Sequence, residues 1–292
     1  MPMSFKTIAR ILAPVTLIAV SFAGIAVGTA AAGTPTALHK TTAHHTAQSS
    51  TYPPVDHQLC YNAQGAFNVP QGIRLINQFS TGGFVPTTIS SVATIHCNPV
   101  QKTAAGVVYP ITNPNAHLAC FNLTTSGQPT PTVVVTNQFG SATLQPSQPN
   151  LLCVPSWKSL TGPPGQQPNT PPNLNHFTCY PVSLVSGGYT PPAVTLQDEF
   201  APAPVPVSIN PVPQELCLPT EKVLPSGQTF PIINPTLHLL CYQVSKTPII
   251  TPVWDENQFG TSAVSISSTK WLCLPSTKQI VSTTTAKQKH AK

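Results

Sequence analysis

The sequence is poor in charged residues. Asp, Glu, Lys and Arg make up 7% of its 292 residues, whereas an average globular domain has about 25%. Seven acidic residues leave few groups for acid–base catalysis, and thirteen basic residues are spread too thinly to form the positive patch that nucleic acids or anionic membranes require. The composition excludes a coiled coil and gives no support to nucleic-acid binding.

Familiar catalytic motifs are absent as well. The chain has no G-x-S-x-G, H-E-x-x-H, P-loop or G-x-G-x-x-G sequence, so nothing indicates a serine hydrolase, a zinc protease or a nucleotide-binding protein. No stretch shows a capped helical period, whereas segments such as 132–136 and 194–196 have the pattern typical of strands. We expect an all-β protein that is not an enzyme and needs no cofactor or metal.

The N-terminus has the order of a secretory signal. Lys6 and Arg10 precede an apolar run over residues 11–27, and small residues follow it. This order predicts a signal peptide over residues 1–32, cleaved after Ala32, although the run is long enough to leave an uncleaved anchor as the alternative. Residues 33–55 form a Thr-, Ala- and His-rich linker. We expect an extracellular or cell-surface protein.

The rest of the chain repeats one pattern four times. Each copy begins with His-x-x-Cys and an aromatic residue, continues with Asn-Gln-Phe or Asp-Glu-Phe, and ends with Cys-x-Pro-x-x-Lys. A Pro- and Gly-rich spacer at 159–175 separates the second copy from the third, which indicates two tandem pairs with a hinge. The copies span 56–102, 117–158, 176–222 and 238–278, and a short basic tail covers 279–292.

Each copy contains two of the eight cysteines. A unit of about 45 residues is too small to hold a core alone, and a disulfide closing about 35 residues contributes roughly 3.5–4 kcal/mol in the chain-entropy model. A zinc site is disfavoured because a fourth ligand and a paired Cys-x-x-Cys are missing. We predict an all-β fold of four small disulfide-stapled units in tandem, arranged as two pairs. The predicted disulfides are Cys60–Cys97, Cys120–Cys153, Cys179–Cys217 and Cys241–Cys273.

These motifs carry a resemblance. The order His-x-x-Cys-Tyr, Asp/Asn-Gln-Phe-Gly and Leu-Cys-x-Pro-x-x-Lys resembles a family of secreted bacterial and archaeal tandem-repeat domains of unknown function, over about residues 56–278. Ser80 and Ala201 replace the glycine in copies one and three, and Asp198 and Glu199 replace Asn and Gln in copy three. The central turns of those copies are therefore expected to differ. The resemblance implies fold and location, and no activity.

The recurrent side chains each have a chemical and a structural interpretation. Four bases without a paired nucleophile make no active site, so we expect the histidines to bond backbone carbonyls: His57, His117, His176 and His238. The lysines could offer positive charges to an anionic glycan, but packing over an aromatic or bonding to carbonyls is preferred: Lys102, Lys158, Lys222 and Lys278. The phenylalanines are predicted core anchors: Phe79, Phe139, Phe200 and Phe259.

Acidic residues and tryptophans are the remaining candidates for a catalytic or sugar-binding role. The carboxylate clusters are Asp198-Glu199 and Asp255-Glu256, and adjacent residues of a strand face opposite ways, so neither supplies the facing pair that glycoside hydrolysis needs. Trp157, Trp254 and Trp271 occupy no site common to all copies, which favours packing near a disulfide over sugar stacking.

Two functions fit best. The preferred one is a non-catalytic secreted or cell-envelope module whose repeats multiply weak contacts with envelope polysaccharide or another surface protein. The alternative is a passive extracellular spacer, and a hydrolase with a site between repeats is disfavoured by the few titratable groups. We expect a monomer that binds no nucleic acid and spans no membrane once the signal is cleaved.

Overall fold

The described part of the chain consists of strands and connecting segments. The computed structural model describes residues 55–281, apart from 126, 128, 166, 168–170 and 172. The all-β prediction is confirmed, because these residues form strands and no helix, and hence no helix able to cross a membrane. The predicted signal peptide, positions 33–54 of the linker and positions 282–292 of the tail lie outside the described residues.

Every repeat opens with one strand and closes with another, and these strands carry the cysteines. The opening strands are β1 (His57–Ala66), β5 (His117–Thr125), β9 (His176–Tyr189) and β14 (His238–Val244). The closing strands are β3 (Val85–Ala104), β8 (Leu151–Ser159), β12 (Ile209–Val223) and β16 (Gly260–Ile280). Antiparallel pairing places the cysteines opposite each other, and the disulfides are Cys60–Cys97, Cys120–Cys153, Cys179–Cys217 and Cys241–Cys273.

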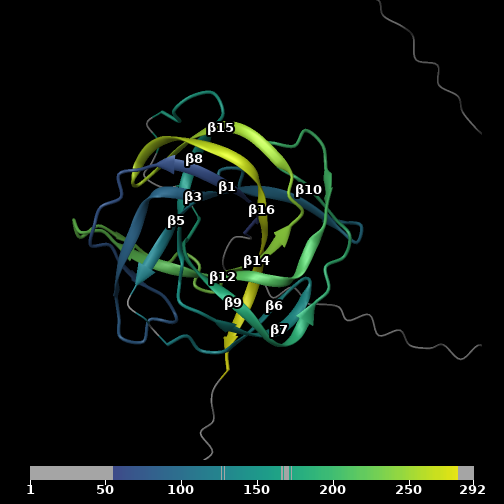
Figure 1. Ribbon diagram of the computed structural model, residues 1–292, viewed down its shortest axis with the longest axis horizontal. Coiled ribbons are helices and arrows are strands. Elements are labelled where there is room, and N and C mark those ends of the chain that lie inside the picture. Colours follow the sequence, from purple (N-terminus) through teal and green to yellow (C-terminus); the bar gives the residue numbers. More distant parts are fainter. Residues whose placement is uncertain are drawn as a thin grey trace, which may run out of the picture. The chain divides into compact units, whose positions relative to one another are not determined.

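The repeats also pair with one another, and this pairing closes on itself. Each opening strand pairs with the closing strand of the preceding repeat: β5 with β3, β9 with β8 and β14 with β12. The first strand, β1, pairs with the last, β16, and Figure 1 shows these strands arranged around a common centre. The repeats therefore share one closed sheet instead of forming self-contained units, and pairing continues across the 159–175 spacer. Within the described residues, each opening and closing strand therefore has a neighbouring strand on both sides.

The inner face of this sheet is filled by the disulfides. Side chains alternate along a strand, so the cysteines point inward together with Leu118, Phe177 and Leu239. Sulfurs of neighbouring repeats touch: the Sγ–Sγ distance is 3.7 Å for Cys60 and Cys273 and 3.8 Å for Cys153 and Cys179. The cavity that remains measures about 10 Å³, room for about one water molecule.

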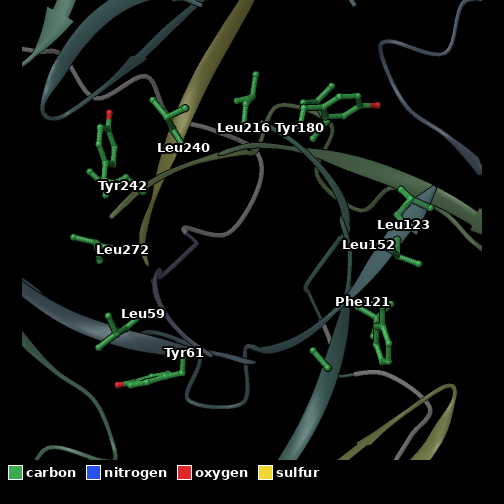
Figure 2. Close-up of a cluster of buried hydrophobic side chains, with 14 of the residues drawn as sticks. Leu59, Tyr61, Phe121, Leu123, Leu152, Tyr180, Leu216, Leu240, Tyr242 and Leu272 are labelled. Carbon is green, nitrogen blue, oxygen red and sulfur yellow. The ribbon is translucent and has the colours of Figure 1, made fainter. Parts of the chain in front are cut away.

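The outer face carries a second apolar layer. Figure 2 shows Leu59 and Tyr61 of β1 on the outside of the ring of strands, with residues of the other repeats such as Phe121, Tyr180 and Tyr242. Inserted strands cover this layer: β2 (Arg74–Ile76), β6 (Val133–Asn137), β7 (Gly140–Pro146), β10 (Val194–Gln197), β11 (Val205–Val207) and β15 (Pro248–Asn257). Two linker strands are β4 (Val107–Tyr109) and β13 (Thr229–Phe230).

Each insertion reaches the repeat two positions away. Strand β2 pairs with β12, β6 with β16, β10 with β3 and β15 with β8. In all four pairs a residue of the insertion lies opposite a recurrent lysine: Leu75–Lys222, Val135–Lys278, Leu196–Lys102 and Asp255–Lys158. Opposite repeats are thereby interlocked, and the same contact occurs four times around the sheet.

Candidate functional site

The recurrent phenylalanines lie at the junctions between repeats. Each packs edge-on against the aromatic residue that follows the first cysteine of the repeat two positions away: Phe79–Tyr180, Phe139–Tyr242, Phe200–Tyr61 and Phe259–Phe121. Phe79, Phe139 and Phe259 are buried, and Phe200 is half-buried. These positions therefore anchor the layer outside the closed sheet.

The recurrent lysines lie over the phenylalanines of the following repeat: Lys102–Phe139, Lys158–Phe200, Lys222–Phe259 and Lys278–Phe79. Lys102 and Lys222 have no exposed surface, and burial lowers their pKa to about 7 and about 6. Only 1% of the Lys158 side chain is exposed. Lys278 is half-buried. All four amines lie over an aromatic ring, and those of Lys102 and Lys222 are closed off from an external anionic glycan.

The recurrent histidines of three repeats face the glutamine of the Asn-Gln-Phe motif: His57–Gln138, His176–Gln258 and His238–Gln78. The expected bond to a backbone carbonyl is present at His238, whose Nδ1 lies 3.0 Å from the oxygen of Thr236. Burial lowers the pKa of His57 to about 3 and that of His238 to about 4. Both imidazoles are therefore neutral near pH 7 and serve contacts between repeats.

At one junction the pattern changes from apolar to polar. Before the second cysteine three repeats have Leu and repeat 1 has His96; after it three have Val or Leu and repeat 1 has Asn98. Repeat 3 has Asp198 and Glu199 for Asn and Gln, and repeat 4 has Asp255 where the others have Leu or Val. We call the group that the structure brings together the Asn98 cluster: Tyr61, His96, Asn98, His117, Lys158, Asp198, Glu199 and Asp255.

Asn98 is the centre of this cluster. Its Oδ1 accepts a hydrogen bond from Lys158 Nζ at 2.9 Å and lies 2.7 Å from His96 Nε2 and 3.1 Å from His117 Nδ1. Its Nδ2 donates to Asp198 Oδ2 at 2.9 Å. The other ring nitrogen of His96, Nδ1, lies 2.9 Å from Asp255 Oδ2. Lys158 can only donate and a carboxylate can only accept, so these neighbours fix which way the Asn98 amide points.

The other members surround the amine and the carboxylate. Tyr61 donates its hydroxyl proton to Asp198 Oδ2 at 2.7 Å. Glu199 forms an ion pair with Lys158, and the Glu199 carboxylate lies 3.9 Å from His117 Nδ1. The cluster thus joins side chains from all four repeats at one point.

Burial governs the ionisation of the cluster. It lowers the pKa of Lys158 to about 7, although the carboxylates of Asp198 and Asp255 act in the opposite direction. It also lowers the pKa of His117 well below the ordinary value and raises that of Tyr61. These shifts follow because a charge loses its hydration inside the protein.

Sequence reasoning missed this site. Strand alternation was expected to separate Asp198 from Glu199, but that expectation was wrong: these residues follow β10 at a turn, so both reach the cluster. His96, Asn98 and Asp255 have no exposed surface. A position-by-position comparison of the four copies would have found all three, since each is polar where its counterparts are apolar.

The remaining predicted residues lie elsewhere. Trp271 lines the inner face beside the disulfides, as the packing interpretation expects, while Trp157 and Trp254 are half-buried on β8 and β15. Within residues 55–281 as described, no group of three or more His, Cys, Asp or Glu side chains is arranged to hold a metal ion.

Fold and site together define a class: an all-β repeat protein whose repeats are interlocked by their own motif residues. Residues 97–275 match the model of a family described as "Repeat of unknown function (DUF7450)". The chain therefore belongs to this family. No curated protein and no solved structure matches the chain.

Proposed function

We propose that the chain is a non-catalytic structural repeat protein that acts outside the cytoplasm. The observation that carries this proposal is the use of the recurrent side chains in contacts between repeats. A motif that serves a ligand keeps polar groups accessible, whereas here Lys102 and Lys222 are closed off and His176 and His238 face glutamines. The repeated chemistry builds the scaffold.

The cysteines support the location. All eight are in disulfides, and such bonds persist in oxidising compartments and are rare in the cytosol. Together with the signal-like segment over residues 1–32, this favours export of the chain to the cell surface or beyond.

Two hollows in the described residues are small, which supports a structural role. The inner cavity measures about 10 Å³, and a hollow beside Asn77 and Tyr180 measures about 20 Å³. Each has room for only one or two water molecules, so neither accommodates a glycan or peptide substrate.

A weak binding function is the second candidate, and exposed apolar side chains favour it. Val107 and Val108 of β4 are 51% and 54% exposed, and Val185 of β9 is 58% exposed. Strand β4 pairs with β3 along one edge, and apolar residues on strand edges can serve contacts with other proteins.

A retention experiment tests the proposal. The purified chain is incubated with envelope polysaccharides and surface proteins of the producing cells, and retention and turnover are both measured. The structural role predicts neither. Specific retention that Val107→Thr and Val108→Thr abolish would favour the binding module, and turnover of any glycan or peptide would overturn the non-catalytic assignment.

A further inference from the structure

Lys158 has neighbours that the other recurrent lysines lack. All four amines lie over a phenylalanine ring, but Nζ of Lys102 and Lys222 has no hydrogen-bond partner among the described residues. Nζ of Lys158 contacts both the Asn98 amide and the Glu199 carboxylate. The other copies have Val or Leu at the position of Asn98 and Gln at that of Glu199. One junction of four therefore combines an amine, an amide carbonyl and a proton acceptor.

The amine and the amide are held for reaction. Nζ of Lys158 lies 2.9 Å from Asn98 Oδ1, so the amide carbon Cγ, one bond further, is within reach of Nζ. Asp198 holds the amide through Nδ2, and His96 holds it through Oδ1. Asn98 and His96 have no exposed surface, so bulk water does not compete for the carbonyl.

We propose that Lys158 and Asn98 form an intramolecular isopeptide bond. The Lys158 amine attacks Cγ of Asn98, the Nζ–Cγ bond forms, the Cγ–Nδ2 bond breaks, and ammonia leaves. Glu199 takes a proton from the amine and delivers it to the departing nitrogen, so Glu199 is regenerated. The neutral amine and the primary amide become a secondary amide and ammonia, and no oxidant or reductant is needed.

The neighbours supply what this reaction requires. Burial lowers the pKa of Lys158 to about 7, so a large share of the amine is the neutral nucleophile near neutral pH. His96 Nε2 donates to the oxygen that becomes negative when Nζ adds to Cγ, which stabilises the tetrahedral intermediate. Asp255 Oδ2 lies 2.9 Å from the other ring nitrogen of His96, Nδ1, and keeps the ring in place.

The isopeptide bond would link two different repeats. Each disulfide joins two strands of one repeat, whereas Asn98 lies on β3 of repeat 1 and Lys158 on β8 of repeat 2. Both strands pair with β5, one on each side. The isopeptide bond would therefore connect β3 to β8 across β5. The isopeptide bond and the structural role proposed above are independent, because the mass of the chain tests the bond and retention on envelope components tests the role.

Mass spectrometry of the exported full-length chain tests the bond. After reduction and denaturation, the mass should be lower than the sequence mass of the same termini by one ammonia molecule. Proteolysis should release a branched peptide that joins residues 98 and 158. A full sequence mass without this peptide would overturn the proposal, and loss of water would place the bond on a carboxylate instead of Asn98.

Substitutions test which residues form the isopeptide bond and which residue promotes it. Lys158→Met and Asn98→Leu should restore the full mass, and Asn98→Leu places there the residue of repeats 3 and 4. Glu199→Gln restores the residue of the three other copies and should slow bond formation on the order of 100-fold. The matched control, Lys222→Met, should keep the ammonia loss. Ammonia loss that persists in Lys158→Met would show cyclisation of an asparagine and overturn the proposal. If a variant does not fold, the peptide map of the unaltered chain decides.

Discussion

Two junctions of the closed sheet, those at Lys158 and at Lys222, share one backbone arrangement and differ in chemistry. At Lys222 the surrounding positions are Leu75, Leu152 and Val154, all buried and apolar. At Lys158 the same positions are Asp255, His96 and Asn98. The comparison teaches that one backbone arrangement accommodates either an apolar or a polar set of side chains, so the arrangement alone does not require the polar set at Lys158.

Removing an aromatic anchor should have the largest effect. Phe259→Ala deletes a buried ring that packs on Phe121 at the Lys222 junction, and we expect the free energy of unfolding to fall by about 3–5 kcal/mol. Phe200→Ala at the Lys158 junction should cost less, because Phe200 is half-buried. Urea unfolding measures both. A larger loss for Phe200→Ala would show that the polar cluster, not ring burial, holds this junction together.

Breaking the His96–Asp255 pair should come next. The measurement uses the Lys158→Met background, in which the proposed covalent bond cannot form. Asp255→Leu leaves His96 buried without its partner and should lower the free energy of unfolding by about 3 kcal/mol. Adding His96→Leu removes the unpaired imidazole and gives both positions the leucines of the Lys222 junction, so it should recover much of that loss in urea unfolding. An unchanged stability for Asp255→Leu alone would contradict the view that the pair is energetically coupled.

The buried amine of the apolar junction predicts a pH dependence. Folding lowers the pKa of Lys222 to about 6 from an ordinary 10.5, so between these values the unfolded chain binds more protons and the free energy of unfolding rises with pH. Lys222 alone should contribute roughly 1.4 kcal/mol per pH unit to this rise between about pH 7 and 9. Lys222→Met should reduce the slope by that amount and leave the contribution of Lys102, whose pKa burial lowers as well. Equal slopes for the two proteins, by urea unfolding at several pH values, would refute the assignment.

The smallest expected effect concerns a second departure from symmetry, on the inner face. Gln58 is fully buried, and neither amide atom has a hydrogen-bond partner in the described protein; its counterparts are Leu118, Phe177 and Leu239. Gln58→Leu should raise the free energy of unfolding by about 1 kcal/mol. A lower stability in thermal or urea unfolding would show that an internal water molecule satisfies the amide.

The repeat pattern predicted a good part of this structure. Alternating apolar residues and the lack of a helical period led to the all-β prediction, and two cysteines per copy led to the pairing that the structure contains. The odd copies share one further local feature: the residue before the first histidine, Asp56 or Asn175, accepts hydrogen bonds from the linker that follows the copy. These features are local, so one copy of the motif is enough to read them.

The candidate site could not be predicted in the same way. His96, Asn98, Lys158, Asp198 and Asp255 come from four different repeats, and they meet because each insertion pairs with the repeat two positions away. Nothing in a single copy specifies this pairing. Reasoning from neighbours along the chain therefore predicted that Asp198 and Glu199 face opposite ways.

By itself the sequence determined strand content, the number of repeats and the covalent pairing within each, because periodicity, motif spacing and cysteine count act over one copy. Only the tertiary structure decided that β1 meets β16, that Lys102 and Lys222 are fully buried and that polar side chains of four repeats meet at one junction. The physical reason is that a unit of this size cannot bury its own apolar surface. It must share a core, and the geometry of that sharing brings distant residues into contact.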